Sequence, residues 1–271
     1  MSDLAPLAPG VYAWLADDPG HGRANAGVVV DADGITVIDS LAVPSQYEPF
    51  AADVEALGMR VKRLVLTSSN AEFAGGTDRF RLAAVYGRPQ ASAHLDQPAD
   101  VSILRRLYPE LAAELDDEWA TRPVSHVIDA PVQLTPAAAV LPFRGQQAEN
   151  LVVVVPGADV VFAGAMAAFG VTPLAYQGDP AAWADALDEL VTLAPIVVPG
   201  LGPIGGEEEV RDLQGYLRAC VDAKGDPSAI PPGPWDAWVG REHDAVNVER
   251  AALLATGDDS IPPTLLRRLG L

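Results

Sequence analysis

Cysteine, lysine and histidine are scarce in this chain. Cys220 is the only cysteine, so neither an intramolecular disulfide nor a cysteine-based zinc site is available. The only lysines are Lys62 and Lys224, and four histidines are present in 271 residues. The formal net charge is -19. We therefore expect neither nucleic acid nor an anionic membrane as a partner, because both are bound through clustered Lys and Arg.

Long hydrophobic runs are absent as well. No window approaches the roughly 20 apolar residues of a membrane-spanning helix. The first residues lack the basic segment and apolar run of a secretory leader, so a cytoplasmic location is expected. Hydrophobic residues nevertheless make up 49% of the chain and charged residues 20%. This composition predicts a stable globule with a large core.

Strand and helix patterns alternate along the sequence. Strands are predicted at residues 11–16, 26–30, 35–38, 61–66, 91–94, 124–128, 132–134, 140–143, 151–155, 160–162 and 196–198. Helices are predicted at residues 44–57, 77–84, 98–118, 180–193, 207–221 and 235–254. The run Glu207-Glu208-Glu209 suits a helix first turn, where negative charge favours the dipole. Two stretches of similar element order predict an α/β fold with two similar halves.

One loop has the frame of a metal-binding motif without its ligands. Residues 67–76 read Thr-Ser-Ser-Asn-Ala-Glu-Phe-Ala-Gly-Gly and follow a predicted buried strand. They resemble the metallo-β-lactamase superfamily signature Thr-His-x-His-x-Asp-His-x-Gly-Gly, in which the loop binds one or two metal ions. Ser68, Asn70, Glu72 and Phe73 stand where His, His, Asp and His would be.

Three later motifs of the superfamily have lost their ligands in the same way. Residues 145–149 resemble Gly-His-Thr-x-Gly, with Gln146 in place of the histidine. Residues 162–165 resemble a hairpin that ends in Gly-Asp, with Ala165 replacing the bridging carboxylate. Residues 198–202 resemble Pro-Gly-His-Gly, with Leu201 in place of the last histidine.

The resemblance implies a four-layer αββα sandwich, with residues 1–271 as a single domain. A catalytic zinc needs about three protein ligands, and Glu72 alone offers a good one at the matched positions. We therefore expect no metal and no other cofactor. The histidines lie elsewhere, at His21, His94, His126 and His243, and a relocated metal site stays an alternative.

The replacements predict a polar cluster in a partly apolar cleft. One interpretation makes Glu72 a general acid or base, because a lone carboxylate in such a pocket tends to have a raised pKa. Ser68, Asn70 and Gln146 would then be donors that orient a substrate or stabilise an oxyanion. The second interpretation is a polar network that fills the former metal cavity, because buried polar groups must satisfy one another. Residues expected to contact a substrate are Phe73, Gln147, Ala165, Tyr176 and Leu201.

Two main hypotheses for the function follow. The first is a metal-independent enzyme that uses the cleft for elimination, isomerisation or cyclisation of a small organic molecule. The second is a non-catalytic binding or scaffold protein. A hydrolase with a relocated metal site is a third. A small molecule is the expected partner, and the surface would permit a homodimer.

Overall fold

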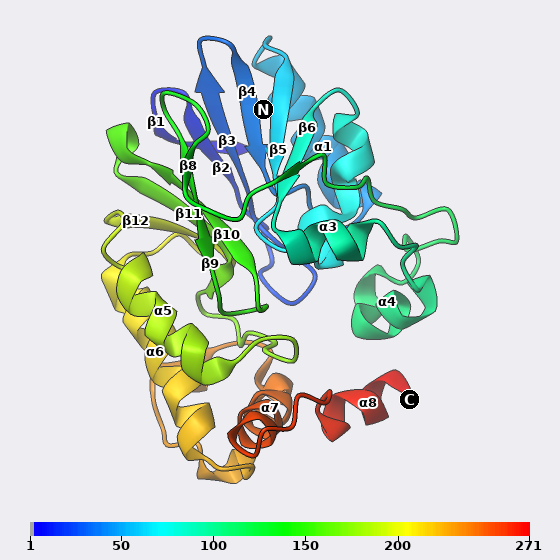
Figure 1. Cartoon of the computed structure of the whole chain (residues 1–271), viewed down its shortest axis with the longest axis vertical. Helices are drawn as coiled ribbons and strands as arrows, with labels where there is room; N and C mark the ends of the chain where they lie inside the picture. Colours follow the sequence, from blue (N-terminus) through cyan, green and yellow to red (C-terminus); the bar gives the residue numbers. More distant parts are fainter. Residues whose placement is uncertain (1–2) are drawn as a thin grey trace.

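The computed structural model describes residues 3–271. Two β-sheets lie face to face, and helices cover their outer faces (Figure 1). The chain therefore has the predicted αββα arrangement. Within residues 3–271, no helix is both long and apolar enough to cross a membrane.

The first sheet has seven strands in sequential order. They are β1 (Leu4–Ala8), β2 (Val11–Trp14), β3 (Ala26–Asp31), β4 (Gly34–Ile38), β5 (Val61–Val65), β6 (Ala84–Gly87) and β7 (His126–Val127). β1 to β4 pair antiparallel, and β4 to β7 pair parallel. Parallel neighbours need crossovers. These contain the helices α1 (Pro44–Ala56), α2 (Ala71–Ala74), α3 (Pro89–Leu95) and α4 (Val101–Leu107), and the 3-10 turns η1 (Gly75–Phe80) and η2 (Pro109–Leu111).

The second sheet has five strands in the order β12, β11, β10, β9, β8. Their bounds are β8 (Val132–Gln133), β9 (Ala139–Phe143), β10 (Asn150–Val155), β11 (Val160–Ala168) and β12 (Ile196–Leu201), with η3 (Pro156–Ala158) between β10 and β11. α5 (Pro180–Leu190) connects β11 to its parallel neighbour β12. The chain then continues through α6 (Glu207–Asp222), η4 (Pro227–Ala229), η5 (Pro234–Ala237), η6 (Arg241–His243), α7 (Asp244–Ala255) and α8 (Pro263–Leu269).

Three apolar clusters occupy the spaces between the four layers. Val37 and Leu64 of the first sheet pack in one cluster with Phe50 of α1. Between the sheets, a second cluster includes Val29 and Val153. On the far side, residues of β10 and β11 pack with α5 and α6; they include Val152, Val161, Trp183, Leu187, Leu213 and Leu217. Every residue of β10 and β11 is buried, as expected for strands covered on both faces.

Two sequence predictions between residues 76 and 94 are wrong. The predicted helix 77–84 is replaced by the rest of η1 up to Phe80, a turn at residues 81–83 and the start of β6, which pairs with β5. The predicted strand 91–94 lies instead in α3, whose first position is Pro89. Proline is preorganised for that position. By contrast, the capping prediction at α6 is confirmed, because Glu209 Oε2 accepts a hydrogen bond from the backbone N–H of Gly206 at 2.7 Å.

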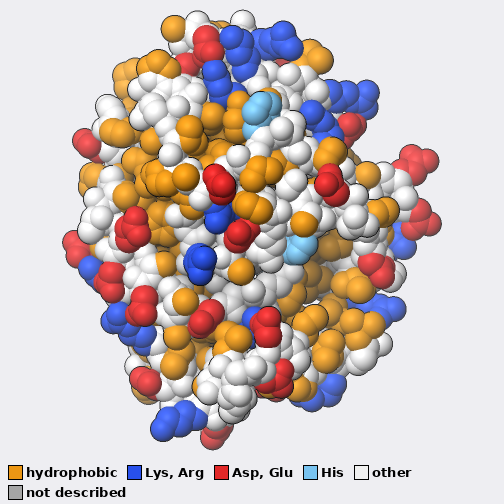
Figure 2. Space-filling model, in the orientation of Figure 1, with side chains coloured by type: hydrophobic (Ala, Val, Ile, Leu, Met, Phe, Trp, Pro, Cys, Tyr) orange, Lys and Arg blue, Asp and Glu red, His pale blue; other side chains and the backbone are white. Residues whose placement is uncertain are grey.

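Acidic and basic side chains are interspersed on the surface seen in Figure 2, among hydrophobic and uncharged polar ones. The net charge of -19 is thus not gathered into one continuous acidic patch on this face.

Candidate functional site

A buried carboxylate holds the start of the ligand-free loop. Thr67 follows β5, and its N–H and Oγ1 donate to the two oxygens of Asp39 at 2.8 and 2.7 Å. Thr67 Oγ1 also accepts from the N–H of Ala165 at 3.1 Å. Burial raises the pKa of Asp39 to about 8, with a smaller contribution from Glu72, although the Thr67 bonds oppose the shift. Asp39 therefore holds Thr67, and Thr67 in turn connects the loop to the segment that contains Ala165.

The paired glycines of the loop are required by close backbone packing. A Cβ on Gly75 would lie 2.1 Å from the carbonyl oxygen of Ala42, and one on Gly76 would lie 2.2 Å from that of Ser40. No side chain fits at either distance. This packing explains why the frame of the motif persists although its ligands are absent.

Gln147 is the centre of a polar network across the loop. Ser68 Oγ donates to Gln147 Oε1 at 2.9 Å and lies 3.2 Å from Gln146 Oε1. Gln147 Nε2 donates to Asn70 Oδ1 at 3.0 Å and to Gln177 Oε1 at 2.8 Å. Three of the predicted polar residues are thus brought together, through a glutamine that was expected only to contact substrate.

A serine and a histidine also meet at this loop. Ser69 Oγ lies 2.9 Å from His94 Nδ1 and 3.1 Å from Gln147 Nε2. A hydroxyl beside an imidazole is the arrangement of a nucleophile and its base, but a third group normally orients the base. Within residues 3–271, no carboxylate is hydrogen-bonded to His94. The pair therefore lacks the third member of a triad.

Glu72 lies on the other side of the loop and is only 4% exposed. Its Oε2 accepts a hydrogen bond from the N–H of Gly22 at 2.7 Å. Burial raises the pKa of Glu72 to about 7, and the Gly22 bond partly offsets that rise. Gly22 has a φ of +83°, and a Cβ there would lie 2.8 Å from the Tyr108 ring. An N-terminal loop thus contributes the partner of the one remaining carboxylate.

Aromatic rings enclose Glu72. The His21 ring stacks on Tyr108 with centroids 4.8 Å apart and meets His243 edge-on at 5.0 Å. Burial and the neighbouring His243 lower the pKa of His21 to about 3, so its ring is neutral near pH 7. Burial and Glu72 raise the pKa of Tyr176. The neutral His21 ring therefore supplies no positive charge that would keep Glu72 ionised, and the phenol of Tyr176 is neutral as well.

The last helix, α8, covers this region from outside. Leu265 and Leu269 of α8 pack in one cluster with Leu174 and Tyr176. Arg106 of α4 donates to the carbonyl oxygen of Leu269. Two short helices that are far apart in the sequence thus close the region around Tyr176, and α8 lies below α4 in Figure 1.

Only a small cavity of about 20 Å³ is left at the former metal position. Seven predicted site residues line it: Asn70, Glu72, Phe73, Gln146, Ala165, Tyr176 and Leu201. Ser68 and Gln147 do not line the cavity. They are hydrogen-bonded to Gln146 and Asn70, which do. The prediction missed His21, Ala167, Ala168, Pro173, Leu174 and Trp183. The sequence signal for His21 was its position between Gly20 and Gly22. The volume suits about one water molecule rather than an organic substrate.

The residues at this position do not fit zinc. Among the residues that line the cavity, Glu72 is the only carboxylate and His21 the only histidine. Phe73, Ala165 and Leu201 offer no donor atom at their ligand positions. Across residues 3–271, no group of three or more His, Cys, Asp or Glu side chains is placed to hold a metal ion. The donor set is therefore that of a hydrogen-bond network and not of a zinc site.

Solved structures similar to this chain include metallo-β-lactamases. The mono-zinc form of FIM-1 from Pseudomonas aeruginosa has a TM-score of 0.61 and 16% identity, over 84% of this chain and 96% of that one. An enzyme from Hirschia baltica gives 0.61 and 16%, over 79% and 96%. One from Erythrobacter litoralis gives 0.60 and 19%, over 79% and 95%. No protein-family model and no curated protein matches the sequence.

These similarities define the fold. The chain has the metallo-β-lactamase fold, as the loop frame predicted. The identities are too low to transfer an activity, because one fold supports many functions.

Proposed function

We propose that this is a metal-independent, non-catalytic binding protein in which a polar plug fills the former metal position. The observation that carries the proposal is the cavity of about 20 Å³, which is closed by Phe73, Leu201 and the polar network. The hydrogen bonds of that network run from side chain to side chain, as expected of groups that satisfy one another. Space of ligand size lies elsewhere, in a groove of about 770 Å³ beside α1.

Substitution of Gln147 separates a structural plug from an active site. Gln147 is 1% exposed and bonds to Ser68, Asn70 and Gln177. In a plug, Gln147→Ala leaves buried partners unsatisfied and lowers the free energy of unfolding by about 2 to 4 kcal/mol. Active-site residues typically behave in the opposite way, and their replacement leaves stability unchanged or raises it.

Urea unfolding of both proteins measures the effect, with Gln97→Ala as the control. Gln97 is exposed and has no side-chain hydrogen bond within the described chain, so its truncation should change stability by less than about 0.5 kcal/mol. A Gln147→Ala protein as stable as the unsubstituted one would contradict the plug.

A second candidate function is acid/base catalysis by Glu72. The specific observation is its pKa of about 7, which suits proton transfer near neutral pH. Such an enzyme would abstract or return a proton in an elimination, isomerisation or cyclisation. The segment around Tyr176 would have to open to admit the substrate.

Proton exchange with solvent tests this candidate without knowledge of the substrate. Small carbonyl acids such as pyruvate and acetoacetate are incubated with the protein in D₂O, and ¹H NMR follows their C–H signals. An acid/base enzyme for this class exchanges these protons, and Glu72→Gln abolishes the exchange. Equal exchange with and without protein counts against this candidate for carbonyl acids.

A further inference from the structure

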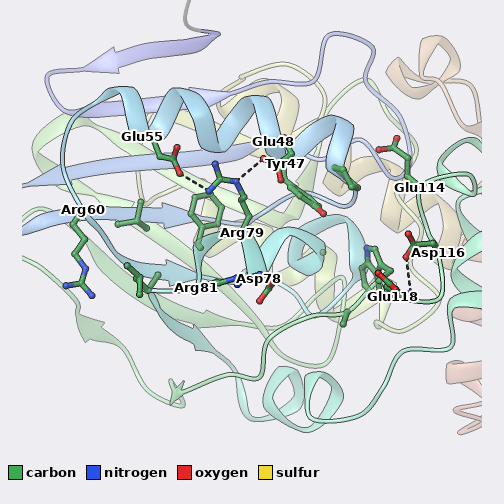
Figure 3. A pocket seen from close by; sticks show the side chains of 18 of the residues that line it. Tyr47, Glu48, Glu55, Arg60, Asp78, Arg79, Arg81, Glu114, Asp116 and Glu118 are labelled. Atoms are coloured by element: carbon green, nitrogen blue, oxygen red, sulfur yellow. Dashed lines mark hydrogen bonds and ion pairs between the residues drawn. The ribbon is translucent and has the colours of Figure 1, made fainter.

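A groove away from the former metal position has the size of a small-molecule site. It lies between α1, η1 and residues 114–120, and its volume is about 770 Å³ (Figure 3). Ligand pockets commonly enclose about 300 to 1,000 Å³. The groove is therefore large enough for an organic molecule, whereas the cavity beside Glu72 is not.

The positive charges in the middle of the groove are already paired. Arg79 donates to Glu48 at 2.9 Å and to Glu55 at 2.7 Å, as the dashed lines in Figure 3 show. Arg81 bonds to Asp78 at 2.9 Å. These two arginines therefore leave little free positive charge for an anionic ligand.

One end of the groove is acidic without a counter-charge. Glu114, Asp116 and Glu118 have no Arg, Lys or His ion-pair partner within the described residues. Glu114 is fixed by the N–H and Oγ of Ser45, at 2.8 and 2.6 Å. Figure 3 places Arg60 at the opposite end. A positive group on a ligand would find its complement at the acidic end.

Aromatic side chains line the same groove: Tyr47, Trp119 and the buried Phe80. Trp119 is held by its indole N–H, which donates to the carbonyl oxygen of Ala42 at 2.9 Å. Tyr47 extends from α1, and its pKa is raised by burial and then by the nearby carboxylates of Glu48 and Glu114. Aromatic faces attract organic cations and pack against their aliphatic parts. The aromatic walls and the acidic end of the groove thus both favour an organic cation.

We propose that the groove binds a small organic polycation, an aliphatic polyamine, with an ammonium group at Glu114, Asp116 and Glu118 and its methylene chain along Tyr47 and Trp119. This inference rests on the proposed binding role and names its ligand class. It does not depend on the plug, because no residue lines both the groove and the cavity at the former metal position.

Isothermal titration calorimetry with spermidine at physiological salt tests the proposal on the full chain. Spermidine should bind with one dominant site, and the double variant Asp116→Asn, Glu118→Gln should bind about tenfold more weakly, as expected for two lost exposed charge pairs. Trp119→Leu should also weaken binding. The neutral 1,8-octanediol should not bind.

A protein with a net charge of -19 attracts any polycation, so a charge-matched control is needed. Glu207→Gln, Glu208→Gln removes two exposed charges at the start of α6 and should leave the affinity unchanged. Equal weakening by the two double variants would show non-specific attraction and overturn the proposal. Absence of spermidine binding, or binding only of a lysine-rich peptide, would overturn it too. A stable Gln147→Ala protein would count against the plug alone.

Discussion

Glu72→Gln should make the stability of the protein less dependent on pH. In the folded protein, burial raises the pKa of Glu72 from its ordinary value of 4.5 to about 7. At about 1.4 kcal/mol per pKa unit, this difference corresponds to about 3 kcal/mol. Because Glu72 is 4% exposed, solvent screens little of it.

The sign follows from proton binding in the two states. Below about pH 4.5 the carboxyl is protonated in both, and it costs the folded state nothing. Between about pH 4.5 and 7 the unfolded chain releases the proton while folded Glu72 keeps it, so stability falls as pH rises. Above about pH 7 the loss is complete. Glutamine stays neutral throughout and still accepts the Gly22 hydrogen bond.

Urea unfolding at pH 4.5 and pH 8 measures the change. Relative to the unsubstituted protein, Glu72→Gln should gain about 3 kcal/mol between the two pH values. The raised pKa of Asp39 also lowers stability as pH rises. Its main cause, burial, is common to both proteins, whereas the smaller contribution of Glu72 is lost in Glu72→Gln and adds to the gain of that variant. Glu189→Gln, at an exposed carboxylate of α5, is the control. If Glu72→Gln and the unsubstituted protein lose stability in parallel, Glu72 is not a buried neutral acid.

Three other outcomes check the site and its frame. Gly76→Ala should lower the unfolding free energy by about 3 kcal/mol, because its Cβ would lie 2.2 Å from the Ser40 carbonyl oxygen, whereas Gly157→Ala, with open space around it, should change it by less than about 0.5 kcal/mol in the same urea experiment. Phe73→Ala should cost about 3 to 5 kcal/mol by thermal or urea unfolding, since the ring is 2% exposed; a smaller loss would mean that the cavity wall is loosely packed. Equimolar Zn²⁺ should leave the thermal midpoint unchanged, because the donor set at the former metal position does not fit it, and a clear rise in differential scanning fluorimetry would contradict that conclusion.

The fold could be predicted from the sequence because close backbone packing requires the glycines of the loop motif. Gly75 and Gly76 are needed wherever this backbone packs against Ser40 and Ala42, whether or not a metal is bound. The apolar runs at β10 and β11 likewise predicted fully buried strands. The two errors between residues 76 and 94 arose where local signals were short. Residues 84–87 form a strand because they pair with β5. A pattern of only four residues is too short to predict that pairing.

The sequence predicted the part of the cavity lining that lies in the loop motifs, but not the rest. Residues at the ligand positions, such as Glu72 and Leu201, followed from the motif order. His21 and Leu174 lie outside those motifs and reach the cavity through long-range packing, which sequence spacing does not reveal. The partnership of Ser69 with His94 was missed for a similar reason, because residues 91–94 were assigned to a strand instead of a helix.

Helix α8 covers the small cavity beside Glu72 and therefore controls the access of solvent to it. α8 has seven residues, and a helix of that length is not stable without its tertiary contacts. Those contacts are the packing of Leu265 and Leu269 and a few hydrogen bonds such as that of Arg106 to Leu269, so its detachment requires far less free energy than global unfolding. Backbone amides of α8 should accordingly exchange with deuterium sooner than those of β10 and β11. Glu72 would then equilibrate its proton with the bulk through brief local openings, while the sandwich around it stays folded.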